Sequence, residues 1–251
     1  MTPRLVTIPI SHYCEKARWA LDRAAVPYEE RRHLQVFHYL AVKRAGGGIS
    51  VPALATDDGT FGDSTDILKW IHGRAPAAGL YPDDAARRAQ VEALEDLFDE
   101  TLGPATRRVI YFHVLDSRAI AFRYNCTGVP RYQRWALHVV LPGARWFLRR
   151  RLKIDAAAAG RDVETIRGVF EDVADRLADG RRYLTGDRFT AADLTFAALA
   201  APVLLPAQYG VPLPPRDEVP PAMQTLVDDF RATPAGRFAL RLFAEDRAAR
   251  A

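Results

Sequence analysis

The sequence is poor in cysteine: among its 251 residues, only Cys14 and Cys126 carry a thiol. Two cysteines are too few for a disulfide framework, and their spacing matches no metal-binding motif. We therefore expect a reducing, cytoplasmic setting and no bound metal ion.

Long hydrophobic runs and a strong net charge are also absent. No segment reaches the about 18 consecutive apolar residues of a transmembrane helix, and the first residues lack a signal-peptide core. The 35 basic and 31 acidic residues leave a net charge of +4, too small to favour a nucleic-acid partner. The one basic cluster, Arg149 to Arg151 with Lys153, is interpreted as a solvated helix face. Neither a membrane nor a nucleic acid is expected as a partner.

Hydrophobic residues make up 49% of the chain and charged residues 26%, which is typical of a globular protein with a sizeable core. The pattern changes near residue 80. Short strands alternate with helices before that point, and nearly everything after Pro82 has helical periodicity. A segment rich in Gly, Pro and Ala at residues 73–79 resembles a linker. We predict an α/β domain at residues 1–75 and an all-helical domain at 86–251.

The first domain has the predicted order βαβ, then a ββ hairpin, then α. Its expected elements are a strand at residues 5–8, an amphipathic helix at 17–24, a strand near 28–34, a hairpin at 53–61 and a helix around 67–71. Residues 37–45 fit either a helix or a loop.

The second domain has clear helical stripes and two less regular stretches. Apolar residues recur at helical spacing in 91–102, 166–177 and 194–205, and Thr190 with Asp193 has the pattern of a capping box. Residues 106–153 are rich in aromatics and contain Pro130 and Pro142, which are interpreted as helix breakers. A Pro-rich loop is expected at 207–221.

Ser11 lies where the first strand turns into the first helix. A helix N-terminus offers unpaired N–H groups and a partial positive charge, so it attracts an anion. A hydroxyl at that point can donate a hydrogen bond to a bound thiolate and lower the pKa of that thiol. The alternative is that Ser11 is a plain N-cap.

Two neighbours of Ser11 carry reactive groups, but neither is interpreted as catalytic. Ser11 and Cys14 form Ser-x-x-Cys, in which a hydroxyl stands at the nucleophilic position of a dithiol motif. Cys14 is therefore expected to be a half-buried packing residue. A nucleophile pair of Ser11 with His12 is disfavoured because no third residue is evident to orient the imidazole.

Two further segments suggest a ligand site. Pro52 enters a strand, and a cis bond there would turn the amide and carbonyl of Val51 outward to pair with a peptide ligand; the alternative is an ordinary strand-initiating proline. Asp63 and Ser64 precede a helix. Ser64 is expected to cap it, the helix amides could hold a carboxylate, and Asp63 could meet an ammonium group; the alternative is a capping run alone.

Together, these segments resemble cytosolic glutathione transferases of the bacterial serine/cysteine type. The resemblance rests on residues 11–21, 51–54, 62–67 and 190–193, which follow the family's order and spacing. It implies a thioredoxin-like N-terminal domain and a helical-bundle C-terminal domain.

The resemblance also implies roles for single residues. Ser11 takes the catalytic position, and glutathione is the co-substrate. The expected glutathione-binding residues are Val51 and Pro52 for the cysteinyl unit, Asp63 and Ser64 for the γ-glutamyl end, and Gln35, His38 or Lys43 for the glycine carboxylate. The second-substrate pocket is expected to include Tyr13, Tyr111 and His113, with Tyr124 and Trp135 as looser candidates.

The leading interpretation is an enzyme that activates the glutathione thiol for conjugation to, or displacement on, a small hydrophobic electrophile. A homodimer is implied by the resemblance alone. One alternative is a non-catalytic binding protein on the same fold. Another is a glutathione-dependent thiol reductase, which the hydroxyl at position 11 disfavours. The chain is rich in Ala, Arg and Pro. With this composition, a low-molecular-weight thiol other than glutathione also stays open as the ligand.

Overall fold

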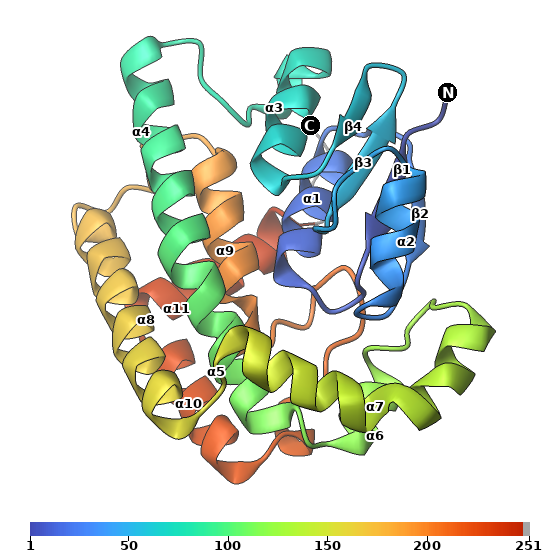
Figure 1. Cartoon of the computed structure of the whole chain (residues 1–251). Helices are drawn as coiled ribbons and strands as arrows, with labels where there is room; N and C mark the ends of the chain where they lie inside the picture. Colours follow the sequence, from blue (N-terminus) through green and yellow to red (C-terminus); the bar gives the residue numbers. More distant parts are fainter. Residues whose placement is uncertain (248–251) are drawn as a thin grey trace.

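The computed structural model describes residues 1–247. Its N-terminal part contains a mixed four-stranded sheet in the order β2-β1-β3-β4, in which β1 is parallel to β2 and antiparallel to β3 (Figure 1). The elements are β1 (Arg4–Thr7), α1 (His12–Arg23), β2 (Glu29–Arg32), α2 (Phe37–Arg44), β3 (Ala53–Thr56), β4 (Gly59–Phe61) and α3 (Ser64–Arg74). The predicted βαβ-ββα order is confirmed, and residues 37–44, which the sequence left open, form a helix.

Helices cover both faces of this sheet because successive strand residues alternate between the faces. Leu5 and Leu54 face α1 and α3 and belong to the main core. Val6 and Ala53, their neighbours along the strands, pack against Val42 of α2 in a separate small cluster. The sheet is therefore the middle layer of a three-layer unit, and the N-terminus of α1 lies at one edge of it.

The C-terminal part is helical. It contains α4 (Ala85–Leu97), α5 (Gly103–Val114), α6 (Arg118–Arg123), α7 (Arg131–Leu152), α8 (Ala156–Leu177), α9 (Ala191–Leu204), α10 (Pro221–Ala232) and α11 (Pro234–Glu245). The predicted domain 86–251 extends to residues 248–251, which lie outside the described part of the chain. Within residues 1–247, no helix is long and apolar enough to cross a bilayer.

Helix α9 is the centre of this part. It lies between α1 and α4 and also packs on α5 and α11 (Figure 1). A helix that is apolar all round is stable only when it is surrounded, and here only Pro202 is less than fully buried. The predicted capping box is confirmed: the Asp193 carboxylate accepts hydrogen bonds from the Thr190 N–H at 2.8 Å and the Thr190 hydroxyl at 2.9 Å.

Pro142 does not end a helix, so its interpretation as a breaker is wrong. It lies inside the 22-residue helix α7, whereas Pro130 does stand at the start of that helix. The solvent-facing side of α7 tolerates the missing N–H, because the buried side, with Leu137 and Leu141, holds the helix in place.

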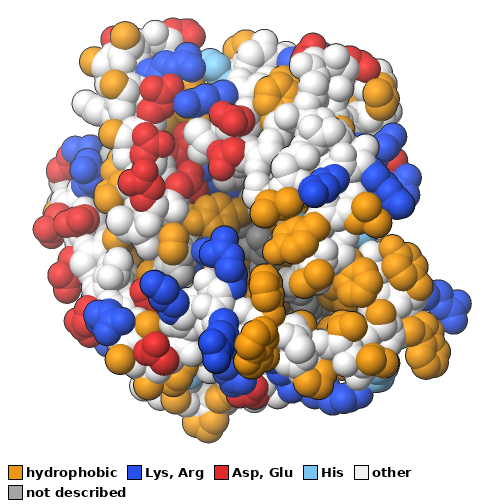
Figure 2. Space-filling model, viewed as in Figure 1, with side chains coloured by type: hydrophobic (Ala, Val, Ile, Leu, Met, Phe, Trp, Pro, Cys, Tyr) orange, Lys and Arg blue, Asp and Glu red, His pale blue; other side chains and the backbone are white. Residues whose placement is uncertain are grey.

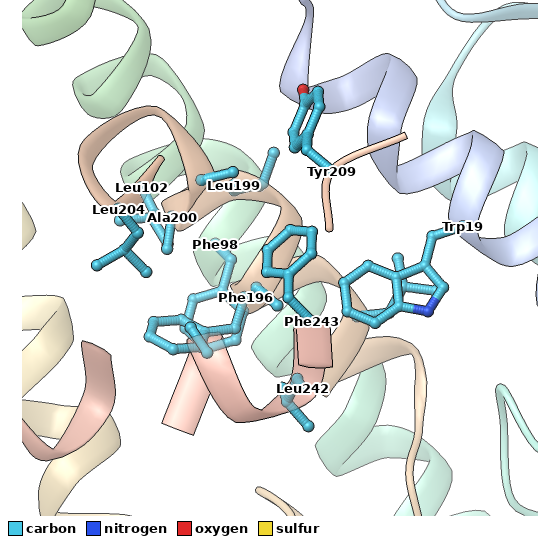
Figure 3. Packing of buried hydrophobic residues seen from close by; sticks show 14 of the residues in the cluster. Trp19, Phe98, Leu102, Phe196, Leu199, Ala200, Leu204, Tyr209, Leu242 and Phe243 are labelled. Atoms are coloured by element: carbon cyan, nitrogen blue, oxygen red, sulfur yellow. The ribbon is translucent and has the colours of Figure 1, made fainter. Parts of the chain in front are cut away.

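Aromatic packing joins the two parts of the chain. Trp19 of α1 is fully buried, and its ring centroid lies 4.9 Å from that of Phe243 in α11 (Figure 3). Phe98 and Phe196 extend the same cluster, with ring centroids 5.3 Å apart. A large shared core of this kind holds α1 in a fixed position against the helical part.

A buried ion cluster lies on the same face of α1. The Lys16 ammonium is 2.8 Å from Glu95 and 2.6 Å from Asp99, and the Lys16 and Glu95 side chains are both 0% exposed. Thr65 of α3 also accepts a hydrogen bond from Lys16 at 2.9 Å. Burial raises the pKa of Asp99, and the Lys16 charge opposes that rise. One ammonium group thus joins α1, α3 and α4.

We expect Lys16→Met to reduce the free energy of unfolding by about 3–5 kcal/mol, because it leaves the fully buried Glu95 and the partly buried Asp99 without their cation. Urea titration followed by circular dichroism measures this. The matched control is Lys69→Met on the exposed side of α3, which should change stability by no more than about 0.5 kcal/mol. Equal effects of the two substitutions would contradict the assigned role of Lys16.

Candidate active site at the tip of the first helix

A cavity of about 350 Å³ lies at the N-terminus of α1, between the sheet domain and helices α5 and α7. The chain segment after α9 closes one side of it through Tyr209, Leu213 and Pro214. A larger cavity of about 630 Å³ adjoins it between α2, α5, α6 and α7. Both cavities have Gln35, Tyr111 and Phe147 among their lining residues, so they share a wall.

Ser11 is the N-cap of α1 and lines the smaller cavity. Its Oγ accepts a hydrogen bond from the Cys14 N–H at 3.5 Å. A hydroxyl has one donor and two acceptor positions, so capping leaves its proton available. The two interpretations of Ser11, cap and donor, are therefore compatible.

Cys14 is fully buried, deeper than the half-buried position expected from the sequence, and burial raises the pKa of its thiol. The thiolate is the reactive form of cysteine, so a raised pKa makes this thiol inert.

His12 is also a structural residue. Its Nε2 lies 3.0 Å from the Gly103 carbonyl, so Nε2 carries the proton and donates it to that oxygen. Burial and the nearby Arg107 charge lower the pKa of His12 to about 3. A neutral imidazole held in this way is a poor base for Ser11.

Tyr13 lines the cavity but also anchors the helix tip. Its hydroxyl donates to the Asp99 carbonyl at 2.9 Å. Gly103 makes this contact possible, since a Cβ at that position would lie 2.2 Å from the Tyr13 hydroxyl. Burial raises the pKa of Tyr13, so the phenol stays protonated.

The Val51–Pro52 peptide bond is cis, the geometry raised from the sequence. Val51 lines the cavity. Within residues 1–247, neither its backbone N–H nor its C=O makes a hydrogen bond. An extended peptide could therefore pair with it as an added strand.

Asp63 and Ser64 lie at the N-terminus of α3, and neither lines the cavity. The expectation that Ser64 caps the helix is wrong: Asp63 is the N-cap, because its carboxylate accepts from the Thr65 N–H at 2.8 Å. Ser64 is 3% exposed, and its hydroxyl makes no hydrogen bond within the described chain. The Asp63 charge acts on Tyr13, which places this helix N-terminus close to the cavity.

The three candidates for a glycine carboxylate differ in position. Gln35 lines the cavity, but its amide is engaged with Asn125, which donates to it at 2.6 Å, and with the Tyr111 hydroxyl at 3.3 Å. His38 also lines the cavity, and its buried Nδ1 has no hydrogen-bond partner within residues 1–247. Lys43 is exposed and lies outside the cavity.

Of the aromatic candidates from residues 106–153, only Tyr111 lines the cavities. His113 does not, because two residues along a helix turn a side chain to the opposite face. Tyr124 donates its hydroxyl to Glu218 at 2.6 Å, and Trp135 is 72% exposed on the outer face of α7.

Two lining residues were missed in the sequence: Arg107 of α5 and Arg151 of α7. The interpretation of Arg149 to Arg151 as a solvated face holds for Arg149, which pairs with Asp116 at the surface, and for Arg150, which lies over the Trp146 ring. It holds for Arg151 in that its side chain is exposed, but this residue also lines the cavity. Only the end of α7 folding back on α5 brings Arg151 to the cavity, so no local signal could have shown it.

The architecture and the cavity define a glutathione-transferase-like protein, and comparison with known families agrees. Residues 5–79 match the glutathione S-transferase N-terminal domain, and residues 155–228 match the glutathione S-transferase C-terminal domain. The two matches together cover more than half of the chain. The chain therefore belongs to the glutathione S-transferase family.

Solved structures share the fold along nearly the whole chain. The theta class glutathione S-transferase from Xanthomonas axonopodis pv. citri, with glutathione bound, is 19% identical with a TM-score of 0.54, covering 95% of this chain and 97% of its own. A glutathione S-transferase from Rhodospirillum rubrum F11 is 21% identical with a TM-score of 0.58, covering 97% and 98%. The beta-etherase LigF from Sphingobium sp. strain SYK-6 is 17% identical with a TM-score of 0.60, covering 96% and 99%. No curated protein sequence matches the chain.

The neutral state of His12 has a measurable consequence. In the unfolded chain His12 takes up a proton near its ordinary pKa of 6.5, whereas in the folded protein its pKa is about 3. The unfolded state binds more protons between these values, so folding stability falls as the pH drops through this window. We expect the wild type to lose about 2 kcal/mol more than His12→Gln between neutral pH and about pH 5.

Urea titrations of the wild type and of His12→Gln across that pH range test this. Parallel stability curves for the wild type and His12→Gln would show that His12 titrates normally.

Proposed function

We propose that this protein is a glutathione transferase that stabilises the thiolate of bound glutathione at the N-terminus of α1. The observation that carries the proposal is Ser11: it caps the helix, faces the cavity and keeps a hydroxyl proton to donate. Glutathione is the thiol that the family likeness favours. The second substrate is a small electrophile in the adjoining apolar space.

Three features support glutathione as the ligand. Val51 offers an unpaired backbone N–H and C=O for the cysteinyl unit. The N-terminus of α3, with Ser64 unpaired and Asp63 beside it, suits the carboxylate and ammonium of a γ-glutamyl group. His38 offers an unpartnered ring nitrogen toward the glycine end.

In the proposed reaction, the chain positions reactants and stabilises charge. The thiol proton passes to water, while the Ser11 hydroxyl and the α1 amides stabilise the sulfur anion. The sulfur lone pair then forms a bond to carbon, and either a leaving group departs with its electron pair or an adjacent carbon takes a proton from water. Lowering a thiol pKa by about two units needs about 2.7 kcal/mol, which one charged hydrogen bond and a helix terminus can supply.

The alternatives are weaker on specific observations. Thiol–disulfide exchange requires an accessible thiol, whereas Cys14 is fully buried and its pKa is raised by burial. A non-catalytic binding protein would not need the unused donor of Ser11. We also propose the domain division 1–75 and 86–251, a cytoplasmic location and a homodimer, all supported by the family likeness.

Ser11→Ala tests the proposal. We expect kcat/KM for conjugation at neutral pH to fall about 100-fold, because one preorganised donor to the anion is lost. The ultraviolet thiolate absorbance of bound glutathione should titrate at higher pH. Ser11→Thr, which keeps a hydroxyl, should retain most activity.

The matched control is Ser117→Ala, which removes an equivalent N-cap from α6 outside the cavity. It separates a loss of helix capping, about 1 kcal/mol, from a loss of chemistry. If Ser11→Ala keeps its activity and its pH profile, Ser11 has no part in the reaction.

A further inference from the structure

Three cationic side chains converge at the mouth of the candidate active site. Arg107 of α5 and Arg151 of α7 line the cavity that contains Ser11. The same two residues and Lys153 also line a smaller cavity of about 290 Å³ beside it. In Figure 2, Lys and Arg side chains gather beside a hollow, in the region where Figure 1 places the end of α7 near α5.

These cations have no acidic partner. Within residues 1–247, the side chains of Arg107, Arg151 and Lys153 form no ion pair and donate no hydrogen bond. Arg108, the neighbour of Arg107 on α5, does have an acidic partner: the Asp162 carboxylate accepts two hydrogen bonds from its guanidinium. An unpaired arginine cluster beside a cavity is a ready site for an anion, because a guanidinium binds a carboxylate with two parallel hydrogen bonds.

The Arg107 charge acts on the reacting space itself. Burial lowers the pKa of His12, and the Arg107 charge lowers it further. The same charge opposes the rise that burial causes in the pKa values of Tyr13 and Tyr111. Its guanidinium also lies over the Tyr13 ring, 6.0 Å from the centroid. His12, Tyr13 and Tyr111 line the cavity on the side of α1 and α5.

The space beyond is apolar. The adjoining cavity of about 630 Å³ is lined mainly by aliphatic and aromatic side chains from α2, α6 and α7, among them Phe37, Leu137 and Phe147. Hydrophobic side chains also cover the surface over this region (Figure 2). A molecule that fills both spaces has an extended apolar body and a negatively charged group at one end.

We propose that the second-substrate site selects electrophiles that carry a carboxylate or a similar oxyanion on an apolar body, held by Arg107 and Arg151. This inference rests on the proposed function and names the substrate class of that site. The carboxylates of glutathione are assigned elsewhere: the features that suit them belong to α3 and α2, whereas both arginines belong to the helical part.

A matched pair of probes tests the proposal: para-carboxychalcone and its methyl ester, which differ mainly in charge. The glutathione sulfur adds to the enone β-carbon, and the α-carbon takes a proton from water. We expect wild-type kcat/KM to favour the acid at least about tenfold, a value in the range of one charge-assisted hydrogen bond. In the variant Arg107→Gln/Arg151→Gln the acid-to-ester ratio should fall to about one or below. Arg150→Gln, at the adjacent arginine that lines neither cavity, should keep the wild-type ratio.

Direct binding of each chalcone without glutathione separates this inference from the proposed function. Tighter binding of the acid that is lost in the double variant supports the anion site, even if no turnover occurs; absent turnover then counts against the transferase alone. The inference is overturned if the wild type binds and turns over acid and ester equally. It is also overturned if the double variant keeps the acid preference, or if it raises KM for glutathione and leaves the ratio unchanged.

Discussion

The buried ion cluster around Lys16 is the constraint on which the site depends. The Lys16 ammonium is buried and its charge is balanced by Glu95 and Asp99, so α1 cannot slide or rotate against α4 without separating these charges. Ser11 lies five residues earlier on the same helix, little more than one turn away. Fixing Lys16 therefore fixes the direction in which the helix N-terminus points. The Trp19 packing on the next turn extends the same restraint deeper into the core.

The residues beside Ser11 serve this restraint rather than the chemistry. His12 donates to the Gly103 carbonyl and Tyr13 to the Asp99 carbonyl, so two successive side chains join the helix tip to the π-helical segment at residues 98–102 and to the start of α5. Both are neutral and have pKa values displaced away from the physiological range. Because neither side chain gains or loses a proton near neutral pH, this part of the cavity wall keeps its electrostatic field at Ser11 constant.

The sequence predicts those helices, strands and site residues that local sequence patterns determine. Alternation and helical periodicity predicted the βαβ-ββα order, and the segment around Pro52 raised the cis geometry as one of two possibilities, which the structure confirms. Errors arose where neighbours compete or where contacts are distant in sequence. Asp and Ser are both common N-cap residues, and only the structure shows that Asp63, and not Ser64, caps α3. Pro142 breaks an isolated helix but not one held by tertiary packing. Arg151 is exposed, as the sequence predicted, but only the fold shows that it lines a cavity together with Arg107.

The cavity thus contains two sources of positive potential, and the two act over different distances. The Ser11 hydroxyl and the α1 amides act over one hydrogen-bond length on one atom, so they require the restraint that Lys16 provides. The arginine pair acts over a longer distance and tolerates some freedom, so it can be built on α5 and the end of α7 without buried ion pairs. Both fields attract anions, and if they overlapped, an anionic electrophile would compete with the thiolate. Their placement on different helices keeps them apart: an oxyanion held by the arginines leaves its apolar body to extend toward the sulfur. Because the arginines stand at a solvated mouth, salt weakens their hold and the anionic product can leave.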